Sequence, residues 1–322
     1  MQRRHLLQAT AAAIALPGLA LAQSYPTRSI RYIVPVAAGG GNDMIARVVT
    51  ERWGAMLGQT FIVDNQSGGG GVVASQMTAR AAPDGYTLMQ GYVATHGTTP
   101  ATRRVSYDAV KQFTPIGMIG ATPNVLVVNA NVPARTVKEF IDYVKREQGK
   151  ISYGSAGQGS LTHLTMELLK QETGMDILHT PYRGIAPAIN DLLGGQTQAM
   201  FPGLAAALPH LRGGKMRALA VTGKTRSPQL KDVPTMEEVG FKGFDAMQWY
   251  GSVGPAGMSA DVVKILNDSQ VAVLKSPDMR DKLAGEAVEP WPMTPAEFGD
   301  YIRADIARWT ALAKARNIQL EE

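Results

Sequence analysis

The stretch SIRYIVPVAAGGGNDMIARVV, residues 29–49, contains a short β-rich run, a glycine-rich turn and the start of an amphipathic helix. Residues 29–34 are rich in β-branched and aromatic side chains, which favour a strand. After the turn, apolar residues recur at helical spacing, so we expect a helix that begins at Met44 and ends before Gly58. A strand, a tight turn and a helix form the repeating unit of sheets covered by helices.

The same alternation continues through the rest of the chain. Amphipathic segments separate most of the β-rich runs, and Thr294, Pro295 and Glu297 form a start signal for a final helix. The pattern predicts an α/β protein with parallel sheets that are covered by helices on both faces. Further strands are expected at 61–63, 86–91, 124–129, 151–153, 177–180, 198–201, 217–222 and 247–253.

Composition excludes several classes of protein. The 322 residues are 45% hydrophobic and 18% charged, which is typical of a globular chain. The net charge is +5, but no run of five basic residues occurs, which argues against nucleic-acid binding. Cysteine is absent, so disulfides, a thiolate nucleophile and zinc–thiolate sites are excluded.

Residues 1–22 have the pattern of a cleaved export signal. A basic start at Arg3 and Arg4 precedes an apolar stretch that ends in Ala20-Leu21-Ala22, an A-x-A cleavage motif. We expect cleavage before Gln23 and a mature protein outside the cytoplasm. The paired arginines leave both the Sec and the twin-arginine route open.

The turn after the first strand is a candidate anion site. Glycines allow backbone N–H groups to approach a ligand, and the first turn of a helix leaves its N–H groups unpaired. Asp43 is expected to turn its carboxylate toward its own helix as a cap. The alternative is an ordinary strand-to-helix turn. The candidate residues are Val36, Ala37, Ala38, Gly39, Gly40, Asn42 and Asp43.

A second turn of similar composition lies at 155–160, again between an expected strand and an expected helix. His163 follows in that helix, although a single histidine is more often a structural group. Two similar turns in two different sheets strengthen the anion interpretation. The candidates here are Ser155, Ala156, Gly157, Gly159, Ser160 and His163.

A rival signal is the G-x-G-x-x-A match at 69–74, which is typical of dinucleotide sites. The ribose-binding acid that such a site needs is missing at the end of the next strand, which reads Gln90-Gly91-Tyr92. The histidines show no paired metal-ligand spacing, and no nucleophile elbow or phosphate loop is present. We therefore predict a binding protein and no enzyme, with neither cofactor nor metal.

Short motifs that occur in order along the mature chain resemble the Bug family, the periplasmic receptors of tripartite tricarboxylate transporters. No single motif decides the matter, but their ordered set is specific. The motifs include Val34-Pro35, Gly39-Gly40, Ala82-Pro83-Asp84-Gly85-Tyr86-Thr87-Leu88, Tyr153-Gly154-Ser155-Ala156-Gly157, Pro181-Tyr182-Arg183-Gly184, Asp191-Leu192-Leu193-Gly194-Gly195-Gln196 and Asp232-Val233-Pro234-Thr235.

The resemblance implies a two-lobed type II periplasmic-binding-protein fold, in which each lobe is a mostly parallel sheet flanked by helices. Lobe 1 would comprise 25–122 and 248–322, and lobe 2 would comprise 123–247. The implied function is capture of a small organic carboxylate between the lobes, for delivery by a monomer to the membrane permease subunits. Other strand ends would also line the cleft, through Tyr92, Thr95, His96, Tyr182 and Pro202.

One departure from the family pattern bears on the ligand. The strand that ends at Phe201 usually continues with Asp-Asn, but here Pro202-Gly203 follows. This predicts a ligand without an ammonium group. Two other functions stay open: presentation of the ligand to a sensor protein in a signalling system, and an enzyme with a dinucleotide site at 69–74.

Overall fold

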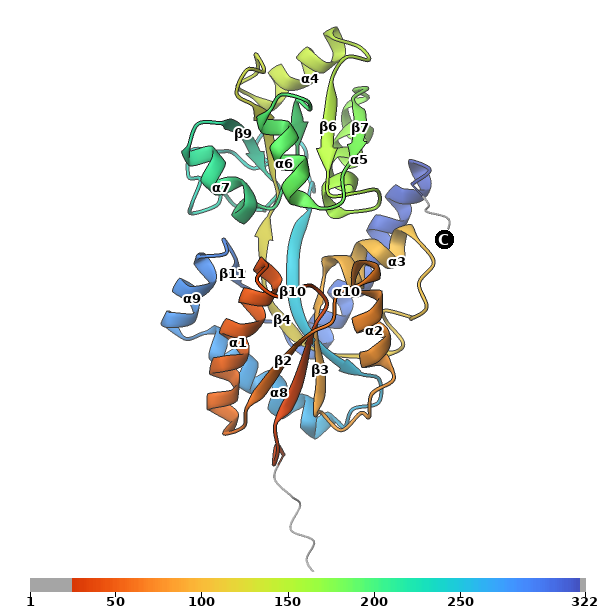
Figure 1. Cartoon of the computed structure of the whole chain (residues 1–322), viewed down its shortest axis with the longest axis vertical. Helices are drawn as coiled ribbons and strands as arrows, with labels where there is room; N and C mark the ends of the chain where they lie inside the picture. Colours follow the sequence, from red (N-terminus) through yellow and green to blue (C-terminus); the bar gives the residue numbers. More distant parts are fainter. Residues whose placement is uncertain (1–24, 319–322) are drawn as a thin grey trace, which may run out of the picture.

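The β-rich and amphipathic segments build two sheets that lie one above the other in Figure 1, each flanked by helices. The computed structural model describes residues 25–318. The expected export signal at 1–22 lies outside these residues. Within the described range, no helix is both long and apolar enough to span a membrane.

The first sheet has six strands in the order β11-β4-β10-β3-β1-β2. Its strands are β1 (Ile30–Val34), β2 (Phe61–Asn65), β3 (Thr87–Tyr92), β4 (Phe113–Pro123), β10 (Met247–Pro255) and β11 (Glu289–Pro290). The helices that accompany it are α1 (Gly41–Leu57), α2 (Val72–Ala79), α3 (Thr99–Thr102), α8 (Ala260–Leu274), α9 (Pro277–Ala284) and α10 (Pro295–Ala315).

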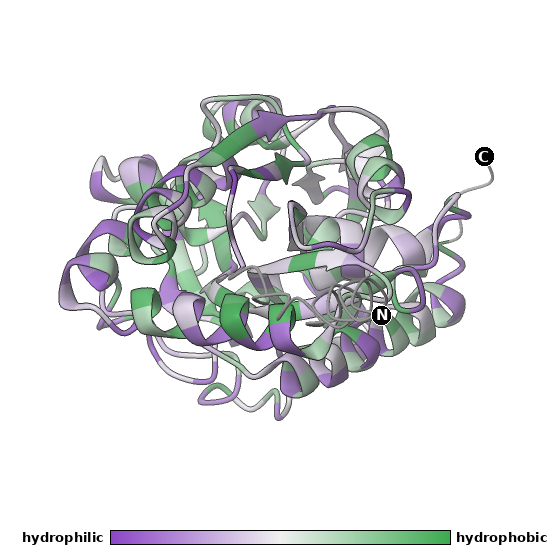
Figure 2. Cartoon of the chain, turned by 90° about the horizontal axis from the view of Figure 1, so that it is seen from below, coloured by the Kyte–Doolittle hydropathy of each residue, from purple (hydrophilic) through white to green (hydrophobic). Residues whose placement is uncertain are grey.

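The second sheet has five strands in the order β7-β6-β8-β5-β9. Its strands are β5 (Val125–Asn129), β6 (Ser152–Ser155), β7 (Leu178–Pro181), β8 (Ala199–Met200) and β9 (Met216–Val221). The helices that accompany it are α4 (Val137–Arg146), α5 (Leu161–Thr173), α6 (Ile185–Leu193) and α7 (Leu204–Arg212). Along the flanking helices, apolar and polar residues alternate (Figure 2), as expected when one side faces the sheet.

The α/β class and the two-sheet arrangement are confirmed, but the strands are less uniformly parallel than expected. In the first sheet, β1 pairs in parallel with β2 and β3, whereas β10 is antiparallel to both β3 and β4. In the second, β6 is parallel to β7 and β8, whereas β5 is antiparallel to β8 and β9. The antiparallel pairs arise where the chain passes between the sheets, because an outgoing and a returning strand run in opposite directions.

The chain crosses between the sheets at β4–β5 and again at β9–β10, which Figure 1 shows as long strands through the centre. Thr222 joins the two crossings. Its backbone N–H donates to the carbonyl of Asn124 (2.9 Å), and its hydroxyl donates to the carbonyl of Ala246 (2.8 Å). β4 was not predicted, because its glycines and prolines interrupt the apolar pattern.

The first helix also differs from expectation, since α1 begins at Gly41 and has Gly40 as its N-cap, so it starts one turn before Met44. The end of the helix at Gly58, in a left-handed conformation, agrees with the prediction. In the final helix the predicted start is confirmed: Thr294 and Glu297 form a complete capping box at the first turn of α10.

Candidate ligand-binding cleft

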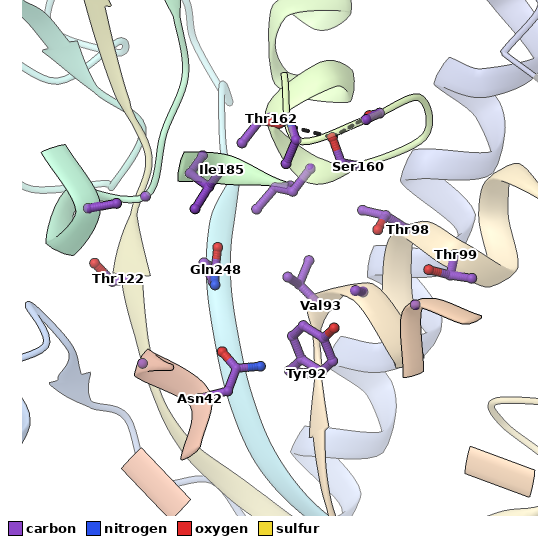
Figure 3. Close-up of a pocket in the computed structure, with 18 of the residues that line it drawn as sticks. Asn42, Tyr92, Val93, Thr98, Thr99, Thr122, Ser160, Thr162, Ile185 and Gln248 are labelled. Carbon is purple, nitrogen blue, oxygen red and sulfur yellow. Dashed lines mark hydrogen bonds between the residues drawn. The ribbon is translucent and has the colours of Figure 1, made fainter. Parts of the chain in front are cut away.

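A cavity of about 870 Å³ lies between the two sheets and is lined by residues from both. Its volume falls in the range that holds small organic ligands. Figure 3 shows Asn42 and Tyr92 on one side and Ser160 and Thr162 on the other, with Gln248 of β10 between them. Both glycine-rich turns therefore face one shared space.

The turn before α1 is held by Asp43. Its carboxylate accepts hydrogen bonds from the backbone N–H of Gly39 (2.9 Å), the guanidinium of Arg47 (3.0 Å) and the amide of Asn65 (2.9 Å). Burial raises the pKa of Asp43, but these hydrogen bonds outweigh that effect and leave the pKa below its usual value. The cap role predicted for Asp43 is thus modified: it lies inside the helix and reaches back to the turn, away from the cavity.

The turn at 155–160 is held by side chains beneath it. The hydroxyl of Thr162 accepts from the N–H of Ala156 (2.9 Å), and Nδ1 of His163 accepts from the N–H of Gly159 (3.1 Å). Gly159 has φ +76°, a conformation that strains other residues. Ser160 caps α5 by accepting from the N–H of His163, and it also donates to the carbonyl of Gly157 (2.6 Å). The backbone of this turn is fixed before any ligand arrives.

An aromatic stack supports this second turn. The rings of His163 and His179 lie 3.9 Å apart, and Tyr153 stacks on His179 at 4.9 Å. Nε2 of His179 is 2.7 Å from the hydroxyl of Ser155, which accepts from the N–H of Gly157. Burial lowers the pKa of both histidines to about 4, so both rings are neutral at neutral pH. His163 therefore has the structural role that was its default interpretation.

The network continues away from the cleft to Glu167. Its carboxylate accepts from the hydroxyl of Tyr153 (2.8 Å) and pairs with Lys170 (2.9 Å), both close to the second sheet. Its other oxygen accepts from Arg316, just beyond α10, at 2.9 Å. The second turn is thus connected through buried side chains to the C-terminal end of the chain.

Six of the predicted site residues lie on the cavity wall. They come from both sheets, as the anion interpretation requires. They are Asn42, Tyr92, Ala156, Gly157, Gly159 and Ser160. Val36, Ala37, Ala38, Gly39 and Gly40 form the turn that leads to the wall, and Gly41, at the end of the same expected turn, lies on it.

The other predicted residues lie elsewhere, and these placements correct the expectation. After β3 the chain winds into a helical turn that directs Thr95 and His96 into the core, where both are fully buried. Burial lowers the pKa of His96 to about 3. Ser155 is buried beneath its turn, Tyr182 donates its hydroxyl to Asp191 (2.6 Å), and Pro202 is buried next to Gly203, which lines the cavity instead.

Several wall residues were missed by sequence reasoning. Val93 and Ala94 line the wall within the segment 92–96 that was expected there, whereas Thr98 and Thr99, at the end of the same helical turn and the start of α3, were not predicted. Their signal was weak because the segment has no apolar period. The remaining missed residues are scattered along the chain and include Arg103, Thr122, Ile185, Gln248, Tyr250 and Glu286.

The glycine motif at 69–74 is explained by packing. Gly69–Gly71 forms a short 3-10 helix ahead of α2. A Cβ on Gly71 would lie 2.4 Å from the side chain of Thr95, so only glycine fits against the turn after β3. Gly70 reaches the cavity wall, but no acid lies at the end of β3. Within residues 25–318, no group of three potential metal ligands occurs.

Comparison with known proteins agrees with this geometry. Residues 45–318 match the family model TctC, described as "Tripartite tricarboxylate transporter family receptor". Protein BugT of Bordetella pertussis is 32% identical, and the alignment covers 100% of both chains.

Two solved structures from Rhodopseudomonas palustris are also similar. Rpa4515 with adipate is 35% identical, with a TM-score of 0.81 over 92% of this chain and 99% of the other. MatC with bound malate is 32% identical, with a TM-score of 0.76 over 89% of this chain and 99% of the other. The chain therefore belongs to the receptor family of tripartite tricarboxylate transporters, whose members are solute-binding proteins and not enzymes.

Proposed function

We propose that this protein is a periplasmic receptor that captures a small organic carboxylate in the cleft and delivers it to the membrane permease subunits of a tripartite tricarboxylate transporter. One observation carries the proposal: the first turns of α1 and α5 open onto the same cavity, at Gly41, Asn42, Leu161 and Thr162. Helix N-termini present unpaired N–H groups and a partial positive charge, which favour an anion.

Adipate and malate, the ligands of two related receptors, are both carboxylates. A carboxylate accepts hydrogen bonds from several backbone N–H groups at once, so main-chain donors on two sides of a cavity suit it. The wall also offers the hydroxyls of Thr98 and Thr99 and the amide of Gln248. These neutral groups orient a ligand without neutralising its charge.

Capture requires that the two halves of the molecule move relative to each other. We infer that 25–122 with 248–322 forms one lobe and that 123–247 forms the other, because the chain passes between the sheets only next to Thr222 and Asn124 within the described residues. Rotation about such paired strands closes a cleft as a hinge. Export by the signal at 1–22, cleaved before Gln23, would bring the receptor to the periplasm.

The direct test is calorimetric titration of the purified protein with adipate, malate and their neutral diamides. At least one acid should bind while its diamide does not, because the diamide carries no negative charge. Failure of every acid in a wider carboxylate panel would refute the proposal.

Gly40→Asp tests the α1 side of the cleft. Gly40 is the N-cap, and a Cβ there meets nothing within 4 Å, so the substitution adds a charge without a clash. Because aspartate is also a good N-cap, stability should not fall. Acid affinity should fall about 10-fold by repulsion near the anion. Gly40→Asn, with the same shape and no charge, is the control and should lose less than about 3-fold.

A further inference from the structure

We propose that Arg103 forms a second anion subsite in the cleft and makes the receptor select ligands that carry two acid groups over those that carry one. The inference rests on the proposed function, since it concerns a carboxylate ligand in the same cavity. It adds a charged side chain to a site whose other proposed anion-binding groups are neutral.

Arg103 directly follows α3, and its backbone N–H bonds to the carbonyl of Thr99 at 3.1 Å, which fixes where the side chain leaves the main chain. The residue lines the cavity and is half-buried. Its Nε is buried and has no hydrogen-bond partner. Within residues 25–318, no carboxylate lies within 4.0 Å of its guanidinium.

A partly buried arginine without an acceptor is unusual in this molecule. Among the described residues, every other arginine whose side chain lacks an acceptor is exposed to solvent: Arg80, Arg104, Arg135, Arg183, Arg212 and Arg280. Arginines that are partly buried elsewhere have partners, as Arg316 has Glu167 and Arg217 has the carbonyl of Ala134. Arg103 alone combines partial burial with a free guanidinium, and it does so at the cavity wall.

An unpaired guanidinium that has lost part of its hydration is costly, and a carboxylate is its best partner. The planar fork of arginine fits a carboxylate with two parallel hydrogen bonds. Thr98 and Thr99 line the cavity one turn earlier in the chain, on the wall shown at the right of Figure 3, and add hydroxyl groups close by. Together these residues form a patch of side-chain hydrogen-bond donors that is separate from the two helix N-termini.

Glu286, the acidic residue on the cavity wall, is not a partner of Arg103. Glu286 lies beside the start of α1, where its Oε2 would be 3.1 Å from a Cβ on Gly41. It follows α9, and Figure 1 places α9 and α3 on opposite sides of the molecule. One end of the cleft is therefore acidic and the other basic. A ligand with one acid group at the helix N-termini and a second at Arg103 matches that basic end.

The test is calorimetric titration of the wild-type protein and three variants with matched acids: adipate against hexanoate, and succinate against butyrate. The variants are Arg103→Gln, Arg103→Lys and Arg104→Gln. Arg104 is the exposed neighbour with the same charge, so its variant controls for a change in net charge alone. Circular dichroism and thermal unfolding establish that each variant is folded.

Wild type should bind at least one diacid at least about 10-fold more tightly than the matched monoacid. Arg103→Gln should weaken that diacid about 10- to 100-fold and the monoacid less than about 3-fold. Arg103→Lys keeps the charge without the fork and should fall between wild type and Arg103→Gln. Arg104→Gln should match wild type.

Equal weakening of diacid and monoacid by Arg103→Gln, no weakening, or a wild-type preference for monoacids would each overturn the inference. If Arg103→Gln does not fold, Arg103→Lys decides, because a loss of selectivity for the diacid supports the subsite and an unchanged ratio refutes it. These results differ from failure of the proposed function, in which wild type binds no acid at all.

Discussion

The two glycine-rich turns that face the cleft have similar sequences, but different chemistry holds them. The turn before α1 is exposed from Ala37 to Gly41, and a charged group fixes it, since Asp43 binds Gly39 and Arg47. The turn before α5 rests directly on neutral groups, chiefly the buried ring of His163 and the half-buried ring of His179. The first turn is therefore anchored by a buried carboxylate whose charged partner, Arg47, reaches solvent, and the second is anchored around the buried ring of His163.

The difference matters for ligand capture. The ion pair of the first turn has a half-exposed arginine, so solvent replaces part of the interaction that is lost when this turn rearranges. A turn anchored by a buried stack keeps its donors in place and pays no ordering entropy on binding. We therefore expect the α5 side to act as the rigid platform, and the α1 side to adapt to it.

The largest loss of stability is expected when Glu167, the buried carboxylate in the network that supports the second turn, is replaced. Glu167→Ala leaves Lys170, whose side chain is 13% exposed, and Arg316 without their carboxylate. Loss of one partner from a buried ion pair costs about 3–5 kcal/mol, measurable by urea unfolding. Asp142→Ala is the control: it breaks an exposed pair with Lys138 and should lower the free energy of unfolding far less. Similar losses in both variants would contradict the claim that buried side chains hold the second turn in place.

As the pH falls, the second turn should lose stability at a higher pH than the first. An unfolded histidine titrates near pH 6.5, whereas burial lowers the pKa of His163 to about 4. Between these two pKa values the unfolded chain binds more protons than the folded one. The contribution of His163 to the free energy of unfolding is therefore fully present above about pH 6.5 and is lost as the pH falls toward about 4. For His163 alone, the loss from about pH 7 to about pH 5 should be about 2 kcal/mol in urea unfolding.

The first turn should not respond in that range. Asp43 has a lowered pKa in the native state, so its contribution is present above the ordinary carboxyl range near pH 4 and is lost only below it. His163→Asn, which keeps an acceptor for the N–H of Gly159, should reduce the decline between about pH 7 and about pH 5, and the lowered pKa values of His179 and His96 account for what remains. An unchanged slope in that variant would show that other groups cause the decline.

The smallest effect is expected at Asp43, the anchor of the first turn. Asp43→Asn removes the charge that faces Arg47, whose side chain is 49% exposed, but keeps one acceptor for Gly39. The expected loss is about 0.5–1.5 kcal/mol in urea unfolding. A loss larger than that of Glu167→Ala would reverse the ranking of the two turns.

Much of the architecture was predictable because strands and helices alternate with clear periods. The exceptions have a physical cause. The segment Phe113–Pro123 becomes a long central strand although it contains two glycines and two prolines, because neighbouring strands on both sides supply its pairing. Such tertiary support leaves no local pattern in the sequence. The short α9 and β11 were missed for the same reason.

The site was predictable where backbone donors form it and less so where side chains do. A glycine-rich turn before a helix can be recognised from the sequence, as at 155–160. The orientation of Thr95 and His96 depended on a helical turn with no periodic signal. Arg103 lies far along the chain from both turns, and only the folded structure brings it to the same cavity.

The end of the chain also limits how the molecule can open. Leu312 and Ile318 share one buried cluster with Leu161 and Leu164 of α5, and α10 packs on α5. Separation of the halves on that flank would expose this apolar surface and break the bond between Arg316 and Glu167. On the α9 flank, Gln229 donates an exposed hydrogen bond to the carbonyl of Ala284 (2.7 Å), and Ala287 adds a small apolar contact with the second sheet. We therefore expect the cleft to open on the α9 flank, while the contact of α10 with α5 keeps the other flank together.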